Sequence, residues 1–260
     1  MTDSPVLIER TGGVAKIILN RPDAGNSITV ELAHQLMHAA IACDEDPSVR
    51  CVLLTGQGRL FCGGGDVGVF ASAGEKLPEV LKEMTAYLHM ALARLARMEK
   101  PLVVAVNGPA AGAGLSLAVC GDLVLAAASA HFTLAYTGIG LSPDAGITWV
   151  LPRLIGMRRT QELVLTNRRV KAEEAVAMGL ATRLVADELL AREATTLASE
   201  LSTGATRALG GARRLLLSSF ETSLETQMEL EAREIATCAR SAHGKEGIAA
   251  FLGKRKPSFT

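Results

Sequence analysis

The chain has 260 residues and a mass of 27.3 kDa, which suits one large domain, with an appendage at most, better than two complete domains. Hydrophobic residues make up 48% of the sequence and charged residues 21%, so a large core can form and a disordered chain is excluded. Lysine plus arginine balances aspartate plus glutamate at 27 each, and aromatic residues amount to 3%, which argues against binding to nucleic acid or to an anionic membrane.

Short apolar runs alternate with amphipathic stretches over the first part of the chain. Strands are predicted over residues 6–10, 14–20, 50–55, 102–106 and 122–126, and helices over 30–44 and 76–98. The first two strands flank Thr11-Gly12-Gly13, which is a hairpin signal. Because the other strands alternate with helices at the spacing of βα crossovers, we expect parallel pairing and an α/β core.

The pattern changes near residue 187, after which no strand signal follows. Amphipathic helices are predicted over residues 188–202, 206–218, 223–239 and 244–252, ahead of a basic tail. We therefore divide the chain into an α/β core over residues 1–190 and a C-terminal helical region over residues 191–260.

Two glycine-rich segments come directly after predicted buried strands. One is Phe61-Cys62-Gly63-Gly64-Gly65-Asp66, and the other, residues 107–114, has the sequence N-G-P-A-A-G-A-G. Glycines make tight turns, and they also let backbone N–H groups approach a ligand with no Cβ in the way. Residues 112–117 lack the third glycine of a dinucleotide fingerprint, and the chain has no G-x-x-x-x-G-K-[ST] motif. The backbone N–H groups of two such loops could together stabilise an oxygen that becomes negatively charged, such as the carbonyl oxygen of a substrate that turns into an enolate.

These two segments resemble motifs of the crotonase superfamily of enoyl-CoA hydratases and isomerases. Further matching segments are residues 19–22 (L-N-R-P), 156–159 (G-M-R-R), 175–180 (A-V-A-M-G-L) and 246–257, so the resemblance runs nearly end to end. It implies a spiral core of ββα turns and a C-terminal helical region used for trimerisation, commonly in a dimer of trimers. It also implies an acyl-CoA thioester as substrate, with no further cofactor.

The resemblance assigns roles to individual residues. The backbone amides of Gly65 and Ala113 are expected to hold the thioester carbonyl oxygen. The expected contacts to CoA and the acyl group come from Ala24, Gly63, Asp66, Val67, Ala111, Tyr136 and Leu141. Lys254 and Arg255 of the basic tail are candidates for CoA phosphates across a subunit boundary, although a solvated charge run explains them equally well.

The two glutamates that hydratases of this family use are missing. The matching positions hold Ser116 and Tyr136, and neither side chain can act as a carboxylate base at neutral pH. The acid that remains is Asp144. Ser142 is predicted to cap a helix with Pro143 at its first position, and the helix dipole alone explains an acid in that first turn. The segment is also similar to that of family isomerases acting on ring-opened or ring-epoxidised phenylacetyl-CoA, in which one aspartate moves the proton.

Three functions remain open. The first is an isomerase in which Asp144 carries a proton between two carbons of an enoyl-CoA and so shifts its double bond. The second is a 4-chlorobenzoyl-CoA dehalogenase or thioester hydrolase with Asp144 as nucleophile and His89 as an auxiliary residue, although an ordinary helix histidine beside Leu88 and Leu92 is the simpler interpretation of His89. The third is a CoA-ester binding trimer without catalysis.

The remaining expectations concern location and metals. The five cysteines are odd in number and form no C-x-x-C pair, so we expect neither a disulfide framework nor a metal site. The first ten residues contain no apolar segment, and no uncharged run approaches the ~18 residues of a membrane span. We expect a cytoplasmic protein whose partners are its acyl-CoA substrate and copies of itself, with no nucleic acid and no membrane.

Overall fold

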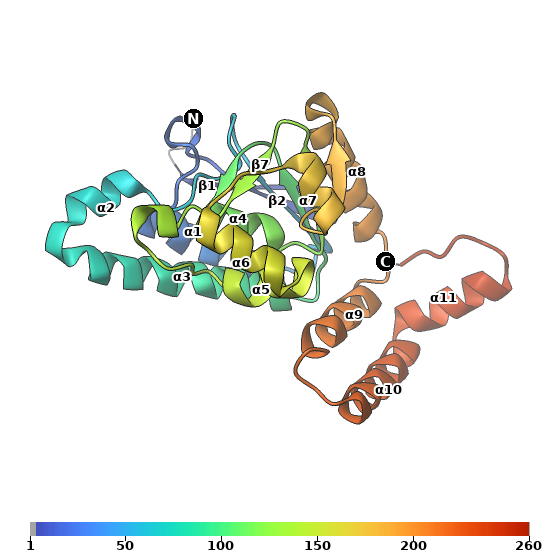
Figure 1. Cartoon of the computed structure of the whole chain (residues 1–260). Coiled ribbons are helices and arrows are strands. Elements are labelled where there is room, and N and C mark those ends of the chain that lie inside the picture. Colours follow the sequence, from blue (N-terminus) through green and yellow to red (C-terminus); the bar gives the residue numbers. More distant parts are fainter. Residues whose placement is uncertain (1–3, 260) are drawn as a thin grey trace.

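A six-stranded sheet runs through the structure, a computed structural model that describes residues 4–259 (Figure 1). Its strands, in spatial order, are β1 (Val6–Thr11), β2 (Val14–Leu19), β3 (Cys51–Gly56), β4 (Leu102–Val106), β6 (Leu123–Ala127) and β9 (Arg183–Val185). The first pair is antiparallel and joined by Gly12 and Gly13, whereas every later pair is parallel. The predicted hairpin and the parallel α/β core are therefore confirmed.

The helices are α1 (Val30–Glu45), α2 (Val67–Ala73), α3 (Leu77–Arg97), α4 (Ala113–Val119), α5 (Ile147–Ile155), α6 (Met157–Thr166), α7 (Ala172–Met178), α8 (Leu190–Ser202), α9 (Thr206–Ser218), α10 (Leu224–Arg240) and α11 (Ala242–Leu252). Two of the core helices, α1 and α3, match the helices predicted over residues 30–44 and 76–98, whereas α2, α4, α6 and α7 were not predicted. The side chain of Thr29 starts α1 by accepting the Leu32 N–H at 3.2 Å. Helices α1 and α3 pack against each other, and α8 packs against β3 and β4.

A second, three-stranded sheet was not predicted. It contains β5 (Ala110–Ala111), β7 (His131–Thr133) and β8 (Val170–Lys171), strands of only two or three residues that are too short to show a period. Strand β5 belongs to the second glycine segment and pairs with β7 through Ala111 and Thr133. This pairing fixes that segment against the chain that leads to Tyr136.

Helices α9, α10 and α11 extend away from the sheet as an arm, drawn in orange and red in Figure 1. Arg213 on α9 joins the arm to the core, because its guanidinium lies 2.7 Å from the Asp122 carboxylate and donates to the carbonyl oxygens of Leu95 and Lys100 at 2.9 and 2.7 Å. Arg50 donates to the carbonyl oxygens of Gly204 and Phe259 at 2.7 and 2.5 Å. The boundary at residue 190 stays a prediction, since α8 packs on the sheet and the arm begins after it.

The Lys100 side chain caps the carboxyl end of α1. Its side chain belongs to a residue only 7% exposed, and Nζ donates to the carbonyl oxygens of Cys43, Asp44 and Asp46 at 2.5, 2.7 and 2.7 Å. Replacing Lys100 with methionine should lower the free energy of unfolding by about 3 kcal/mol, because buried carbonyls lose their donor while the apolar stem is kept. Urea denaturation followed by circular dichroism measures this loss. The matched control is Lys82→Met on the exposed face of α3, expected within about 0.5 kcal/mol of wild type; equal losses in the two variants would contradict the prediction.

Candidate active site

The two glycine segments lie side by side. The Ala111 N–H donates to the Cys62 carbonyl at 2.9 Å, and the Cys62 N–H donates to the Pro109 carbonyl at 3.3 Å. Gly64 has φ +90°, and a Cβ built there would approach the Ala111 carbonyl oxygen to 2.7 Å and the Gly112 Cα to 3.4 Å. Only glycine fits this approach, which brings the backbone around Gly64 against the backbone that begins α4.

Gly65 and Ala113 both have backbone N–H groups available for a ligand. Their neighbours are paired, since the Asp66 N–H donates to the Ile28 carbonyl and the Gly112 N–H to the Thr133 carbonyl, each at 3.0 Å. Within residues 4–259, neither the Gly65 nor the Ala113 N–H donates to a protein acceptor. Ala113 is the first residue of α4, where the amide has no partner inside the helix.

Asp144 does not lie in a helix, which corrects the sequence prediction. Helix α5 begins at Ile147, so Ser142 is not its N-cap and Pro143 is not its first residue. The reason is backbone conformation: Ala145 and Gly146 have φ of +54° and +74°, in the left-handed region that interrupts a right-handed helix. Glycine adopts this conformation freely, but alanine pays roughly 1 kcal/mol for it. The strained turn places Asp144 ahead of the helix, outside its first turn.

The Asp144 carboxylate contacts two side chains that come from distant parts of the sequence. The Tyr136 hydroxyl donates to Oδ1 at 2.6 Å, and Nε2 of His89 on α3 lies 3.5 Å from Oδ2. Burial first, and the neighbouring Asp144 charge second, raise the pKa of Tyr136 well above its usual value. Tyr136 therefore stays protonated and acts as a donor, while the Asp144 side chain remains 25% exposed and accessible to a ligand.

His89 also supports the strained turn. Its Nε2 accepts the Ala145 N–H at 3.1 Å, an arrangement that requires a neutral ring with its proton on Nδ1. An imidazolium would instead point Nε2–H toward Asp144, so the two contacts of Nε2 are alternatives. The structure brings the expected auxiliary residue to Asp144 and leaves its side chain 49% exposed, unlike the buried Leu88 next to it.

Ser116 lies next to Tyr136. It is on α4 one turn after Ala113 and only 3% exposed, and its hydroxyl has no hydrogen-bond partner among the described residues. The hydroxyl faces that of Tyr136, and this contact lowers the pKa of Tyr136 against the larger effects of burial and Asp144. The sequence identifies Ser116 only as a replaced glutamate; its unpaired hydroxyl becomes visible in three dimensions.

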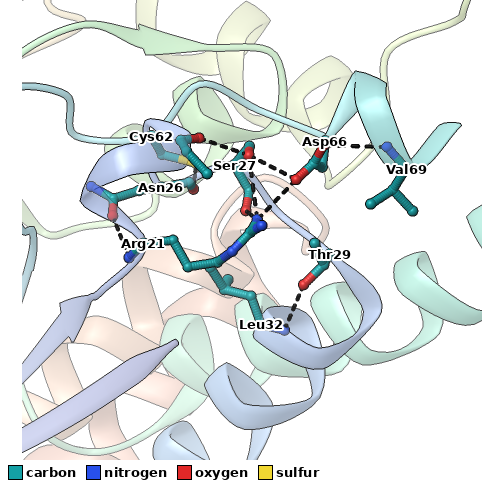
Figure 2. Close-up of polar contacts among 9 residues, drawn as sticks. Arg21, Asn26, Ser27, Thr29, Leu32, Cys62, Asp66 and Val69 are labelled. Atoms are coloured by element: carbon teal, nitrogen blue, oxygen red, sulfur yellow. Dashed lines mark hydrogen bonds and ion pairs between the residues drawn. The ribbon is translucent and has the colours of Figure 1, made fainter. Parts of the chain in front are cut away.

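The Asp66 carboxylate already accepts hydrogen bonds from groups of the protein itself, as Figure 2 shows. Oδ2 accepts from Arg21 at 3.0 Å and from Ser27 at 3.2 Å, and Oδ1 accepts the Val69 N–H at 3.3 Å, which starts α2. Burial acts to raise the pKa of Asp66, but these hydrogen bonds and the Arg21 charge outweigh it and hold the pKa below its usual value. Asp66 thus attaches the loop that contains Arg21 and Ser27 to the first glycine segment.

Of the other residues expected to bind substrate, Gly63 and Ala111 belong to the glycine segments themselves. Ala24, Gly63 and Val67 are exposed, whereas Ala111 and Leu141 are half-buried. The Gly63 N–H donates to the Gly25 carbonyl at 2.9 Å, which joins the loop of Ala24 to the first segment. Nearby Cys62 is fully buried, and burial raises the pKa of its thiol to about 12, so it is a packing residue.

No three His, Cys, Asp or Glu side chains within residues 4–259 are grouped so that they would hold a metal ion. No helix in the same range combines the length and the apolar character needed to span a membrane.

Comparison with known proteins gives the family. The model of the family described as enoyl-CoA hydratase/isomerase matches residues 9–260. The chain belongs to this family. The match confirms the resemblance to crotonases, and the solved structure described below confirms the expected fold class.

Individual members of the hydratase/isomerase family differ in their named activities. A 1,2-epoxyphenylacetyl-CoA isomerase of Escherichia coli is 40% identical over 95% of both chains. A 4-chlorobenzoyl coenzyme A dehalogenase of an Arthrobacter species is 30% identical over 99% of this chain and 94% of the relative. The crystal structure of an enoyl-CoA hydratase from a Polaromonas species superposes with a TM-score of 0.94 at 31% identity, covering 98% of this chain and 99% of that one.

Proposed function

We propose that this protein is an enoyl-CoA isomerase that shifts a double bond, or rearranges a ring-derived acyl-CoA, with Asp144 as its one proton carrier. The observation that carries the proposal is the 2.6 Å hydrogen bond from Tyr136 to Asp144, in a site where Ser116 and Tyr136 stand at the two glutamate positions of the hydratases. A lone carboxylate with a fixed donor suits proton transfer between two carbons of one substrate.

The backbone amides of Gly65 and Ala113 supply the second part of the proposed mechanism. Both are unpaired, and the segments that carry them are hydrogen-bonded to each other. A thioester oxygen held by two N–H groups accepts charge readily, which acidifies the carbon-bound hydrogen next to the carbonyl or further along the conjugated chain. The CoA moiety would pass Ala24, Gly63, Asp66 and Val67, and the acyl group would pass Ala111, Tyr136 and Leu141.

The proposed reaction moves one proton and creates no net charge. Asp144 removes a proton from one end of the allylic system, and the electron pair of that C–H bond enters a dienolate whose negative oxygen faces the two amides. The same carboxyl returns the proton two carbons away, which regenerates the thioester with its double bond moved. Tyr136 holds Oδ1, so Oδ2 is the oxygen that takes up the proton. No redox step and no metal ion take part in this sequence.

The test of this function is isomerisation of trans-3-hexenoyl-CoA in deuterated water, followed by NMR at the α and γ carbons. The α,β-unsaturated isomer and deuterium at these two carbons are expected. Formation of the 3-hydroxy product without isomerisation would instead make the protein a hydratase. Tight binding of the thioester with no exchange would make it a CoA-ester binding protein.

A second candidate function rests on His89. Its approach to Asp144, at 3.5 Å, suits a site in which a carboxylate attacks an aryl ring and a histidine assists hydrolysis of the resulting ester. The similarity to an Arthrobacter dehalogenase adds support. Incubation with 4-chlorobenzoyl-CoA should then release chloride and leave an aryl ester on the protein, detectable by mass spectrometry; neither product is expected from the isomerase.

We also propose that the arm assembles the protein into a homotrimer, alone or as a dimer of trimers. None of the residues of α10 is buried in the single chain. Exposed apolar side chains of the arm are Leu216, Phe220, Leu224, Met228, Ile235, Ile248, Phe251 and Leu252. Exposed apolar surface of this kind marks a protein interface. Lys254 remains a candidate for CoA phosphates, whereas the Arg255 guanidinium already pairs with both oxygens of Glu246, at 2.6 and 2.7 Å.

Replacing Ile235 with glutamate should convert this assembly into monomers. The side chain is 72% exposed on α10, so the change is tolerated in a single chain but buries a carboxylate in an interface, at a cost of several kcal/mol. Light scattering after size exclusion should give three or six times 27.3 kDa for the wild type and 27.3 kDa for Ile235→Glu. Glu231→Gln, a polar change on the same helix, serves as the control. A wild-type protein of monomer mass would contradict the proposed assembly.

A further inference from the structure

The face of α1 turned away from the core carries two histidines one turn apart. His38 follows His34 by four residues, which places both side chains on the same side of the helix. Their Nε2 atoms are 3.1 Å apart, and the two rings meet edge to face with their centroids 4.5 Å apart. Within residues 4–259, neither ring makes a hydrogen bond to any other group. Neither histidine has a part in the proposed mechanism.

The two imidazoles turn the same kind of nitrogen toward each other. A neutral imidazole has one N–H and one lone pair, so the 3.1 Å contact is a hydrogen bond only while one of the rings has its proton on Nε2. When that proton is on Nδ1 instead, both Nε2 atoms present a lone pair. Two neighbouring imidazole lone pairs are a donor set for a divalent metal ion.

The distance between the two nitrogens fits one shared ion. Imidazole nitrogens bind zinc at about 2.0–2.1 Å. Two nitrogens at this distance from one ion are roughly 2.9 Å apart when they meet at a right angle and roughly 3.3 Å apart at the tetrahedral angle. The 3.1 Å between His34 and His38 lies between these values. The separation of the rings therefore suits an ion of square or of tetrahedral geometry.

The surroundings hold one ring and leave the other accessible. His34 is half-buried, and the Tyr87 ring of α3 packs edge to face against it with the centroids 4.9 Å apart. This contact between two helices restricts the orientation of the His34 ring. His38 is exposed, so an ion can reach its Nε2 from solvent and its ring can turn toward that ion.

The charge on α1 favours a cation, and the nitrogen donors select its class. Glu31 lies one turn before His34 and adds negative charge, while its carboxylate accepts a hydrogen bond from Gln35. The helix contains no lysine or arginine that would repel a cation. Imidazole suits the late first-row metals nickel, copper and zinc, whereas magnesium and calcium prefer oxygen ligands.

We propose that His34 and His38 form a chelating site on α1 for a divalent transition metal ion of the nickel, copper and zinc group. The chain supplies two ligands and water the others, which agrees with the lack of any larger group of metal-binding side chains within residues 4–259. The cysteines, from whose spacing no metal site was expected, take no part. The site shares no residue with the glycine segments or with Asp144, so it does not depend on the proposed function.

The test is isothermal titration calorimetry of the untagged full chain with nickel chloride, because nickel(II) does not oxidise free thiols. The wild type should bind one Ni²⁺ per chain. His38→Gln should bind Ni²⁺ about a hundredfold more weakly, because the second nitrogen of a chelate acts at a high effective concentration. His34→Gln should show the same loss. A wild type without a saturable site for one ion per chain, or wild-type affinity in either variant, would overturn the proposal.

Two controls separate the pair from histidine in general. His131→Gln removes a histidine on β7 and should keep the wild-type affinity. A double variant with His38→Ala and Ala42→His keeps all five histidines but places the second ring about 12 Å along the helix from His34. It should bind Ni²⁺ as weakly as His38→Gln, with far-UV circular dichroism showing that it is folded. Wild-type affinity in this double variant, or an equal loss in His131→Gln, would place the ion elsewhere and contradict the site.

Discussion

Replacing Asp144 with asparagine should lower kcat for isomerisation of trans-3-hexenoyl-CoA by about a thousandfold, which is within the range lost with a general base. Asparagine has the shape of aspartate, and its carbonyl oxygen can still accept the Tyr136 hydrogen bond, which is 2.6 Å long in the wild type. It cannot take up a proton. KM should change little, since the amides of Gly65 and Ala113 are unaffected. A coupled assay that detects the α,β-unsaturated product measures both constants.

The control for this variant is Asp187→Asn, which changes an exposed carboxylate far along the chain. Asp187 accepts the Ser129 N–H at 3.0 Å, a hydrogen bond that asparagine can keep. Its kcat should equal that of the wild type. Normal turnover by Asp144→Asn would remove Asp144 from the mechanism and leave the isomerase proposal without a base.

Replacing Ala113 with proline should lower kcat by about a hundredfold or more, the range found when one oxyanion donor is removed. Proline deletes the backbone N–H that is proposed to hold the thioester oxygen. Ala113 is the first residue of α4, where proline is well tolerated because the amide has no partner inside the helix. The loss should appear in kcat, since charge on the oxygen grows in the transition state.

Ala113→Ser keeps the N–H and serves as the control, with kcat expected within a few fold of wild type. Far-UV circular dichroism and the assembly mass establish that the proline variant is folded. A folded Ala113→Pro protein with unchanged kcat would contradict the role of this amide.

The parts of the fold that could be predicted are those with a long, repetitive pattern. Strand β4 (Leu102–Val106) is buried at every position, so the sequence shows it as an uninterrupted apolar run, and its bounds match the prediction. Helix α9 (Thr206–Ser218) likewise has the predicted bounds, because its apolar residues recur at the period of a helix. Strands β5 and β8 have two residues each and show no period, so pairing with β7 alone defines them.

The predicted start of α5 was wrong for a different reason. Ser142 and Pro143 form a strong local signal for a helix start, but the chain turns through left-handed Ala145 and Gly146 before the helix begins. The Ala145 N–H donates to His89, which lies 56 positions earlier in the chain. A contact over this distance stabilises a conformation that local preferences disfavour, and a pattern of neighbouring residues cannot reveal it.

The candidate site shows the same limit. Motifs in the sequence are enough to select Gly65, Ala113 and Asp144 as candidates. The hydrogen bond from Tyr136 to Asp144, the approach of His89 and the unpaired Ser116 hydroxyl depend on how α3, α4 and β7 are packed. These contacts support the proposed isomerase, and only the folded chain contains them.

The most direct measurement is a crystal structure of Asp144→Asn with trans-3-hexenoyl-CoA bound. We predict that the thioester oxygen accepts hydrogen bonds from both the Gly65 and the Ala113 N–H at about 2.7–3.1 Å, with residue 144 beside the carbons that exchange protons. A thioester oxygen that contacts neither amide, or a side chain at position 144 turned to solvent away from the acyl group, would contradict the proposed mechanism.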